Sequence, residues 1–154
     1  MEGITKDKAL IKLTDMCSKR EICPSKATEL MWRWGVKAND QQEILEYLTL
    51  NRFIDPKRYA LLFVREKCRL GKWGKRKIIE ALRIKHISKE VITTAIEQEY
   101  KEEKETLELI IKQKMKTIKG KDSRDIANKL IRFALSRGFE YEEVKNVLEK
   151  LKVL

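Results

Sequence analysis

The chain has 154 residues, 38% of them charged, and its 35 Lys and Arg against 24 Asp and Glu give a formal net charge of +11. This length suits one domain or a few small units that bury a core without disulfides or metals. No apolar run reaches the roughly 18 residues of a membrane span, and no signal-peptide pattern is present. Three cysteines without a CxxC pair, and a single histidine, argue against zinc sites and catalytic triads. We therefore expect a cytoplasmic protein that is not an enzyme and has a polyanionic partner.

Apolar residues recur three and four positions apart along almost the whole chain, which is the spacing of amphipathic helices, and strand patterns are nearly absent. The pattern predicts nine helices, around 9–17, 24–34, 40–48, 56–70, 75–85, 89–96, 100–118, 123–134 and 144–151. Pro24 and Pro56 stand at first-turn positions. Asp55 and Ser88 are placed to cap the fourth and sixth helices.

Three related phrases indicate an internal repeat: "RWGVKANDQQEILEYL", "LRIKHISKEVITTAI" and "LSRGFEYEEVKNVL". Each has a basic helix end, a turn, and then a helix anchored by apolar residues. We therefore predict an all-α protein of three tandem three-helix repeats, at 1–54, 55–100 and 101–154. Units this small must stack to bury their apolar faces. The expected result is an elongated, curved, right-handed helical array.

The positive charge is concentrated in the middle of the chain. Residues 51–87 contain 12 Lys and Arg against 3 acidic residues, while all other residues together contribute a net charge of only +2. At 100° per residue, Arg58, Arg65 and Arg69 lie within about 40° of one another on the fourth helix. Arg76 and Arg83 share a face of the fifth. Rows of guanidinium groups suit phosphates and carboxylates, which they grip in bidentate fashion.

The turn "RLGKWGKRK" between these two helices adds an aromatic residue among lysines. Trp73 is either an anchor that stacks on a base or a protein partner, or a core residue at the junction of two repeats. The predicted binding residues are Lys57, Arg58, Arg65, Arg69, Lys72, Trp73, Lys75, Arg76, Lys77 and Arg83. No phosphate-binding glycine loop and no isolated carboxylate pair accompanies them.

The segment "NRFIDPKRYALLFVREKCRLGKWGKRKIIEALRIKHISKEVITTAI" resembles the central repeat of the bacterial RecX regulators. The matching residues are Phe53, Ile54, Asp55, Arg58, Tyr59, Ala60, Phe63, Val64, Gly74, Lys77, Ile78, Leu82, Ile87 and Ser88. The end of the chain is also similar to the end of that family, through Leu130, Arg132, Gly138, Phe139, Tyr141 and Val144. The beginning matches loosely, through Ala9, Leu10, Leu13 and Cys17. His86 stands where the family usually has glycine, and Pro56 replaces a common acidic residue.

This resemblance implies a regulator without a cofactor that binds the RecA recombinase along the groove of its filament on single-stranded DNA. We expect it to be a monomer. Such a protein would inhibit the recombinase and ATPase activities of RecA, and so tune recombination, DNA repair and the SOS response. The residues alone leave an alternative open, namely a helical module that binds nucleic acid without RecA.

Overall fold

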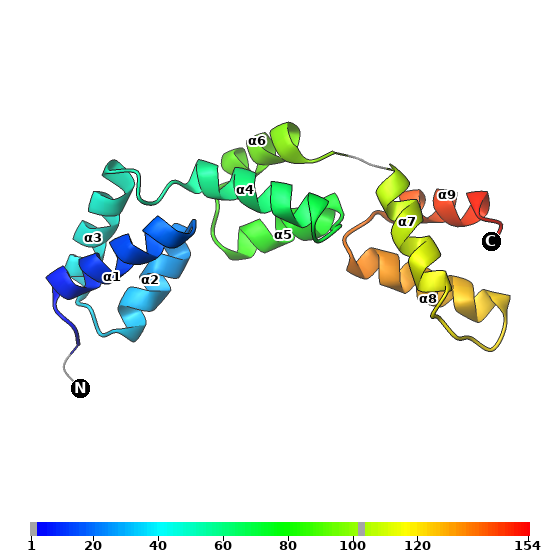
Figure 1. Ribbon diagram of the computed structural model, residues 1–154, viewed down its shortest axis with the longest axis horizontal. Coiled ribbons are helices and arrows are strands. Elements are labelled where there is room, and N and C mark those ends of the chain that lie inside the picture. Colours follow the sequence, from blue (N-terminus) through cyan, green and yellow to red (C-terminus); the bar gives the residue numbers. More distant parts are fainter. Residues whose placement is uncertain (1–2, 102–103) are drawn as a thin grey trace. The chain divides into compact units, whose positions relative to one another are not determined.

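The computed structural model describes residues 3–101 and 104–154 (Figure 1). The helices of this part of the chain are α1 (Lys6–Lys19), α2 (Pro24–Arg33), α3 (Ala38–Leu50), α4 (Pro56–Arg69), α5 (Lys75–Ile84), α6 (Lys89–Glu99), α7 (Lys104–Met115), α8 (Ser123–Ser136) and α9 (Tyr141–Lys150). All nine predicted helices are present, and the described residues form no strand, so the all-α prediction is confirmed.

Helix starts follow local signals that the sequence displays. Asp55 Oδ1 accepts hydrogen bonds from the backbone N–H groups of Lys57, at 3.0 Å, and Arg58, at 3.3 Å, which confirms the predicted cap of α4. Ser88 Oγ accepts from the N–H of Val91 at 3.3 Å and caps α6. The predicted start of the seventh helix at residue 100 is wrong, because residues 100 and 101 are not helical; residues 102 and 103 lie outside the described residues.

The chain divides into two compact units: Met1–Leu62 with Leu82–Ala95, and Phe63–Ala81 with Ile96–Leu154. The division passes through α4, α5 and α6. The predicted repeat boundaries, 1–54, 55–100 and 101–154, and the predicted curvature stay predictions.

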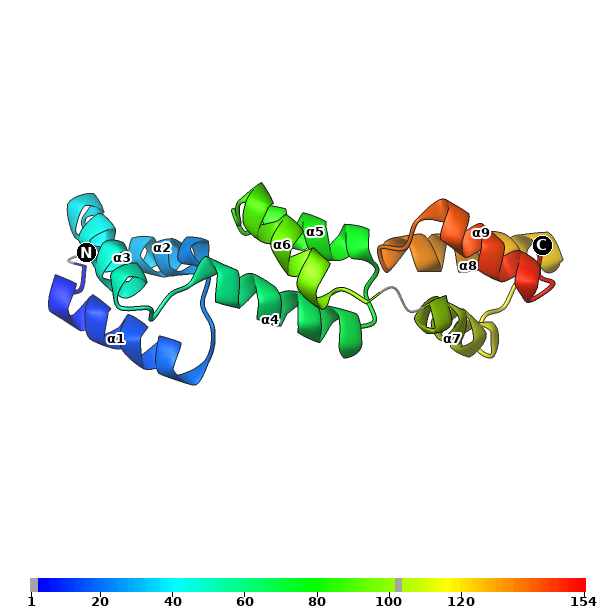
Figure 2. The same ribbon diagram turned by 90° about the horizontal axis from the view of Figure 1, so that it is seen from above.

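Each unit contains its own hydrophobic core. In the first, α1, α2 and α3 pack together, and Leu13, Met31, Ile44 and Leu48 are fully buried among them (Figures 1 and 2). In the second, α7, α8 and α9 pack around a cluster that includes Ile111, Leu130, Ala134, Val144 and Leu148. Apolar residues at helical spacing therefore face inward in both three-helix groups, as the sequence pattern predicts.

One turn recurs at three places, between α2 and α3, between α5 and α6, and between α8 and α9. Its central residue has a positive φ: 75° at Gly35, 60° at His86 and 94° at Gly138. The next residue is buried, and its N–H donates to a carbonyl five residues earlier: Val36 to Met31, Ile87 to Leu82 and Phe139 to Ala134. This is the helix-ending bond of a Schellman motif. The internal repeat seen in the sequence therefore has a counterpart in backbone geometry.

The carbonyl just before the central residue of each turn accepts a hydrogen bond from a distant segment. Trp34 O accepts from the N–H of Ile4 at 3.1 Å, and Arg137 O accepts from the N–H of Gly74 at 2.6 Å. At the middle turn, Lys85 O accepts from Ser25 Oγ at 2.7 Å. Each turn is thus contacted by a segment at or near the start of a helix. The contact is made through backbone at the first and third turns and through a side chain at the middle turn.

Candidate partner-binding surface

The predicted binding residues divide between the two units. Lys57, Arg58 and Arg83 belong to the first unit, and the other seven belong to the second. All ten are on α4, on α5 or in the turn between these helices. Their neighbours show which of them are already engaged inside the protein and which have their charge available to a partner.

Arg58 is engaged within the first unit. Its Nε donates to Glu21 Oε1 at 2.5 Å, and its Nη2 donates to the carbonyl of Arg52 at 3.0 Å. The hydrogen bond to Glu21 is the main cause that raises the pKa of Arg58. The other carboxylate oxygen of Glu21, Oε2, is buried without a hydrogen-bond partner. Loss of Arg58 would leave the half-buried carboxylate of Glu21 without its counter-ion, so this arginine has a structural role.

Arg65 is engaged within the second unit. Its Nη2 donates to Glu99 Oε1 at 2.7 Å and its Nε to Glu99 Oε2 at 3.2 Å, a bidentate pair that joins α4 to the end of α6. The hydrogen bond from Arg65 lowers the pKa of Glu99 and is the largest contribution to that shift. The guanidinium is about half exposed, but its hydrogen-bonding edge already faces a carboxylate.

Arg76 binds backbone rather than a carboxylate. Its Nη2 donates to the carbonyl of Leu135 at 3.0 Å, and its N–H donates to the carbonyl of Gly138 at 3.2 Å. Both acceptors lie at the end of α8. Next to this contact, a Cβ added to Gly74 would lie 2.3 Å from the carbonyl carbon of Gly138. The start of α5 therefore packs backbone to backbone against the α8–α9 turn.

Besides Arg76, five of the predicted cations have no carboxylate within ion-pair distance in the part of the chain that the structure describes. They are Lys57, Arg69, Lys72, Lys75 and Lys77. All but Lys57 belong to the second unit, on α4, on α5 or in the turn between them. Because no internal carboxylate neutralises them, these side chains can interact with an external anion without breaking an ion pair.

Trp73 contacts residues of the second unit, and its predicted role as an anchor for a partner stays a prediction. Its half-buried ring makes an edge-to-face contact with Phe63, with centroids 6.3 Å apart, so part of it packs inside the second unit. The ammonium groups of Lys67 and Lys77 lie 4.7 and 4.3 Å from its ring centre. The ring therefore holds two cations in place beside the α4–α5 turn.

Three residues that the sequence reasoning missed lie next to this turn. Lys114 on α7 and Arg137 at the end of α8 place their charged groups 5.1 and 5.3 Å from the ring centre of Phe133. Together with Lys72 they line a pocket of about 440 Å³. Lys114 and Arg137 follow the pattern of basic residues at helix C-termini, which favours an interpretation as simple helix-end charges. Only the packing of α7 and α8 beside the turn brings them together.

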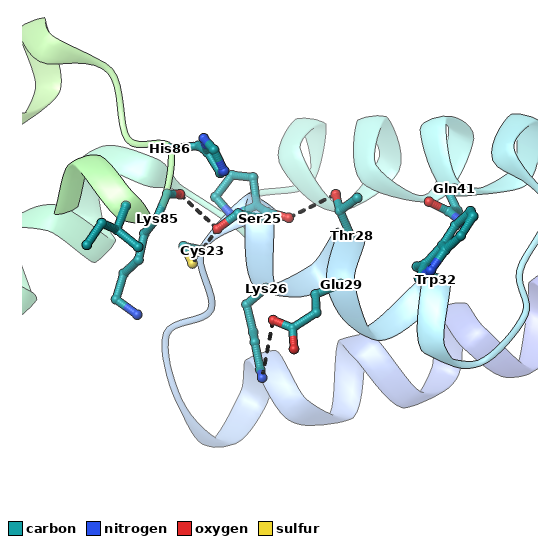
Figure 3. Close-up of a pocket in the computed structure, with 11 residues that line it drawn as sticks. Cys23, Ser25, Lys26, Thr28, Glu29, Trp32, Gln41, Lys85 and His86 are labelled. Atoms are coloured by element: carbon teal, nitrogen blue, oxygen red, sulfur yellow. Dashed lines mark hydrogen bonds and ion pairs between the residues drawn. The ribbon is translucent and has the colours of Figure 1, made fainter. Parts of the chain in front are cut away.

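A larger groove, of about 730 Å³, lies in the first unit between α2 and the α5–α6 turn (Figure 3). It is lined by Trp32, which is 78% exposed, and by His86. Its charges are mixed, because Glu29 lies 3.7 Å from Lys26 and 2.7 Å from Arg33. Within the described ranges no group of His, Cys, Asp and Glu could hold a metal ion. No helix there is long and apolar enough to cross a bilayer.

Two sequence models of one family match this chain. The model described as "RecX, second three-helix domain" matches residues 57–96, and "RecX, third three-helix domain" matches residues 102–148. Together they cover more than half of the sequence. The first match includes most of the basic residues considered above.

Curated relatives point to the same family. "Regulatory protein RecX" of Clostridium tetani is 36% identical over 113 residues, which are 71% of this chain and 51% of the relative. "Regulatory protein RecX" of Clostridium botulinum is 33% identical over 122 residues, which are 75% of this chain and 57% of the relative. The chain thus spans a little over half the length of these relatives.

Solved structures share the fold. The crystal structure of RecX from Lactobacillus salivarius superposes with a TM-score of 0.77 at 17% identity and covers 97% of both chains. A crystal structure of a regulatory protein RecX gives a TM-score of 0.82 at 22% identity, over 96% of this chain and 72% of the other. With the two matched three-helix domains, these likenesses confirm the predicted all-α helical-repeat fold.

Proposed function

This chain belongs to the RecX family of regulatory proteins, and from that premise we propose that it binds the RecA filament on single-stranded DNA and lowers the recombinase and ATPase activities of RecA. The observation that carries the proposal is that two RecX domain models match this chain, and that the first of them, over residues 57–96, contains most of the concentrated positive charge. The setting is recombination, DNA repair and the SOS response in the cytoplasm, with the protein acting as a monomer and without catalysis.

Charge supports the mechanism. A filament of protein on DNA is a large anionic polymer, and a cationic surface is drawn to it at rates and affinities that depend on salt. In the second unit, Arg69, Lys72, Lys75 and Lys77 offer charge that no carboxylate of the described residues neutralises. A protein that binds one state of the filament more tightly than another shifts the balance between those states. Regulation then follows from differential binding, with no chemical step.

The test compares two double variants that change the net charge equally. Arg69→Glu with Lys75→Glu reverses two unpaired cations of the second unit. Lys8→Glu with Lys37→Glu reverses two exposed lysines of the first unit that have no ion pair among the described residues. Inhibition of the DNA-dependent ATPase of RecA is measured against protein concentration at two salt concentrations. We expect the first variant to need about tenfold more protein for the same inhibition, and the second to match the parent chain.

Two results would contradict the proposal. Equal loss of inhibition in both variants would show that only net charge matters. A parent chain that leaves the RecA ATPase unchanged, yet binds bare nucleic acid tightly and with a steep salt dependence, would favour the alternative of a nucleic-acid-binding module that acts without RecA.

A further inference from the structure

The pocket beside the α4–α5 turn has an unusual charge balance. We call it the cationic pocket, and its main lining residues are Leu70, Lys72, Ile110, Lys114, Phe133 and Arg137. No acidic side chain of the described residues lines it. None of its three cations has a carboxylate partner in the described part of the chain. The groove in the first unit differs on this point, because Glu29 lines it and pairs with two cations.

Helix ends do not cancel this charge. Lys114 lies in the last turn of α7, Arg137 is the C-cap residue of α8, and Lys72 follows the end of α4. Each helix C-terminus carries a partial charge of about −0.5. Three full positive charges against three such half-charges leave the pocket clearly positive. The partial negative charges of the helix ends allow the fold to hold these cations together without a bound ligand. An anion that enters the pocket interacts with the remaining positive charge and breaks no ion pair of the described residues.

Apolar side chains also line the pocket. Ile110 is only 7% exposed, and the half-buried ring of Phe133 lies under the charged groups of Lys114 and Arg137. Leu70 is 82% exposed. A free inorganic anion would make no use of these surfaces. A ligand that joins an anionic group to a less polar body, as a nucleotide does, would use both.

One feature favours a linear polyanion over a compact acidic group. Beyond the pocket, the chain continues with Lys75 and Lys77, which also lack carboxylate partners among the described residues. A strand with one negative charge at each nucleotide would meet these cations in turn.

We propose that the cationic pocket binds the backbone of single-stranded DNA, with Lys72, Lys114 and Arg137 contacting phosphate oxygens and with Ile110 and Phe133 contacting the adjoining sugar or base. The inference rests on the proposed function for its setting, since it assigns the DNA contact within that role. It names Lys114, Phe133 and Arg137 as binding residues beyond those that the sequence suggested.

The test uses the full chain and a fluorescein-labelled 20-mer of deoxythymidine without RecA, with binding followed by anisotropy over a series of salt concentrations. The pocket variant carries Lys72→Gln, Lys114→Gln and Arg137→Gln. The control carries Lys116→Gln, Lys119→Gln and Lys121→Gln, three exposed lysines of the same unit. Single-stranded DNA releases about 0.7 counterions for each phosphate neutralised. We therefore expect the pocket variant to lower the slope of log K against log salt by about 2 and to weaken binding about tenfold or more, with much smaller changes in the control.

Several outcomes would overturn the pocket. The first is an equal effect of the two variants on DNA binding, and the second is a parent chain with no measurable DNA binding at low salt. The third is a pocket variant that loses binding to labelled polyglutamate but keeps its affinity for the DNA. That result would identify an acidic peptide as the occupant of the pocket. NMR of the parent chain needs no variant: the DNA should shift the Arg137 Nε–H signal, and an unchanged signal contradicts the proposal. RecA inhibition is scored separately. If the chain inhibits RecA but its DNA binding does not depend on the pocket, only the pocket proposal is refuted. If its DNA binding depends on the pocket but it does not inhibit RecA, only the proposed function is refuted.

Discussion

Replacing Gly138 with alanine should destabilise the second unit far more than replacing Gly35 with alanine destabilises the first. Both glycines occupy the central position of the recurring turn, with φ of 94° and 75°. An alanine forced into the left-handed region costs about 1–2 kcal/mol at either position. The two sites differ in what a new Cβ would meet, which is a helix at Gly138 and the segment before α1 at Gly35, so the pair compares a clash with a rigid neighbour and a clash with a more mobile one.

At Gly138 the added Cβ would lie 2.4 Å from Lys77 Cβ and 2.6 Å from the backbone nitrogen of Lys77, inside a helix that cannot yield easily. To relieve that clash, the start of α5 must move away from the α8–α9 turn. This movement lengthens two backbone hydrogen bonds, from Gly74 N–H to Arg137 O and from Arg76 N–H to Gly138 O. Each such bond contributes about 0.5–1.5 kcal/mol. The total loss for Gly138→Ala is therefore about 2–5 kcal/mol.

At Gly35 the new Cβ would meet Gly3 Cα at 2.9 Å, in an exposed segment before the first helix that can shift at small cost. The loss there should stay near the turn cost of about 1–2 kcal/mol. Urea unfolding followed by circular dichroism measures both variants. Hydrogen exchange of the Gly74 and Arg76 amides reports the docking directly, because it should accelerate only in Gly138→Ala. Equal losses in the two variants, with unchanged exchange at both amides, would refute the reasoning.

Three further outcomes are expected. Asp55→Ala removes the side-chain cap of α4 and should cost about 0.5–2 kcal/mol in the free energy of unfolding, measured by urea titration. Leu130→Ala opens a cavity in the fully buried core of the second unit and should cost about 2–5 kcal/mol by the same measurement, whereas an effect below 1 kcal/mol would mean that the site is not packed as described. Because Arg65 lowers the folded-state pKa of Glu99, the stabilisation from this pair is complete above the unfolded pKa of about 4.3 and is lost as the pH falls through the folded pKa. Glu99→Gln should therefore show a smaller loss of thermal stability than the parent chain on acidification from about pH 6 to pH 3.

Local signals in the sequence predict most of the secondary structure. The spacing of Leu13, Ile44, Leu130 and Leu148 places each on the buried side of its helix, and the cap at Asp55 lies where the Asp-Pro pair predicts it. These features depend on residues a few positions apart, so a single sequence displays them. The seventh helix starts late because the charged run before it contains good helix formers but no cap that marks a boundary.

The binding surface is less predictable, since it depends on contacts between distant residues. The stripe expected on α4 contains Arg58 and Arg65, but Glu21 and Glu99 pair with them across the fold. Helical spacing shows which face a side chain occupies and gives no information on which carboxylate lies opposite. The same limit hid Lys114 and Arg137, which gain significance only when α7 and α8 pack beside the α4–α5 turn. His86 adopts φ of 60° at the position that glycine occupies in the two other turns, so this turn forms without glycine at some conformational cost.

The contact between Gly74 and the α8–α9 turn is made from peptide groups, with glycine on both sides. A joint of this kind, made by backbone contacts, requires almost no complementary side chains. It can therefore persist while most of the surrounding residues are substituted. It also suggests how such a protein could lengthen during evolution. A duplicated helical segment would already carry both halves of the joint, and it could attach to its neighbour before any selection had shaped a matching surface.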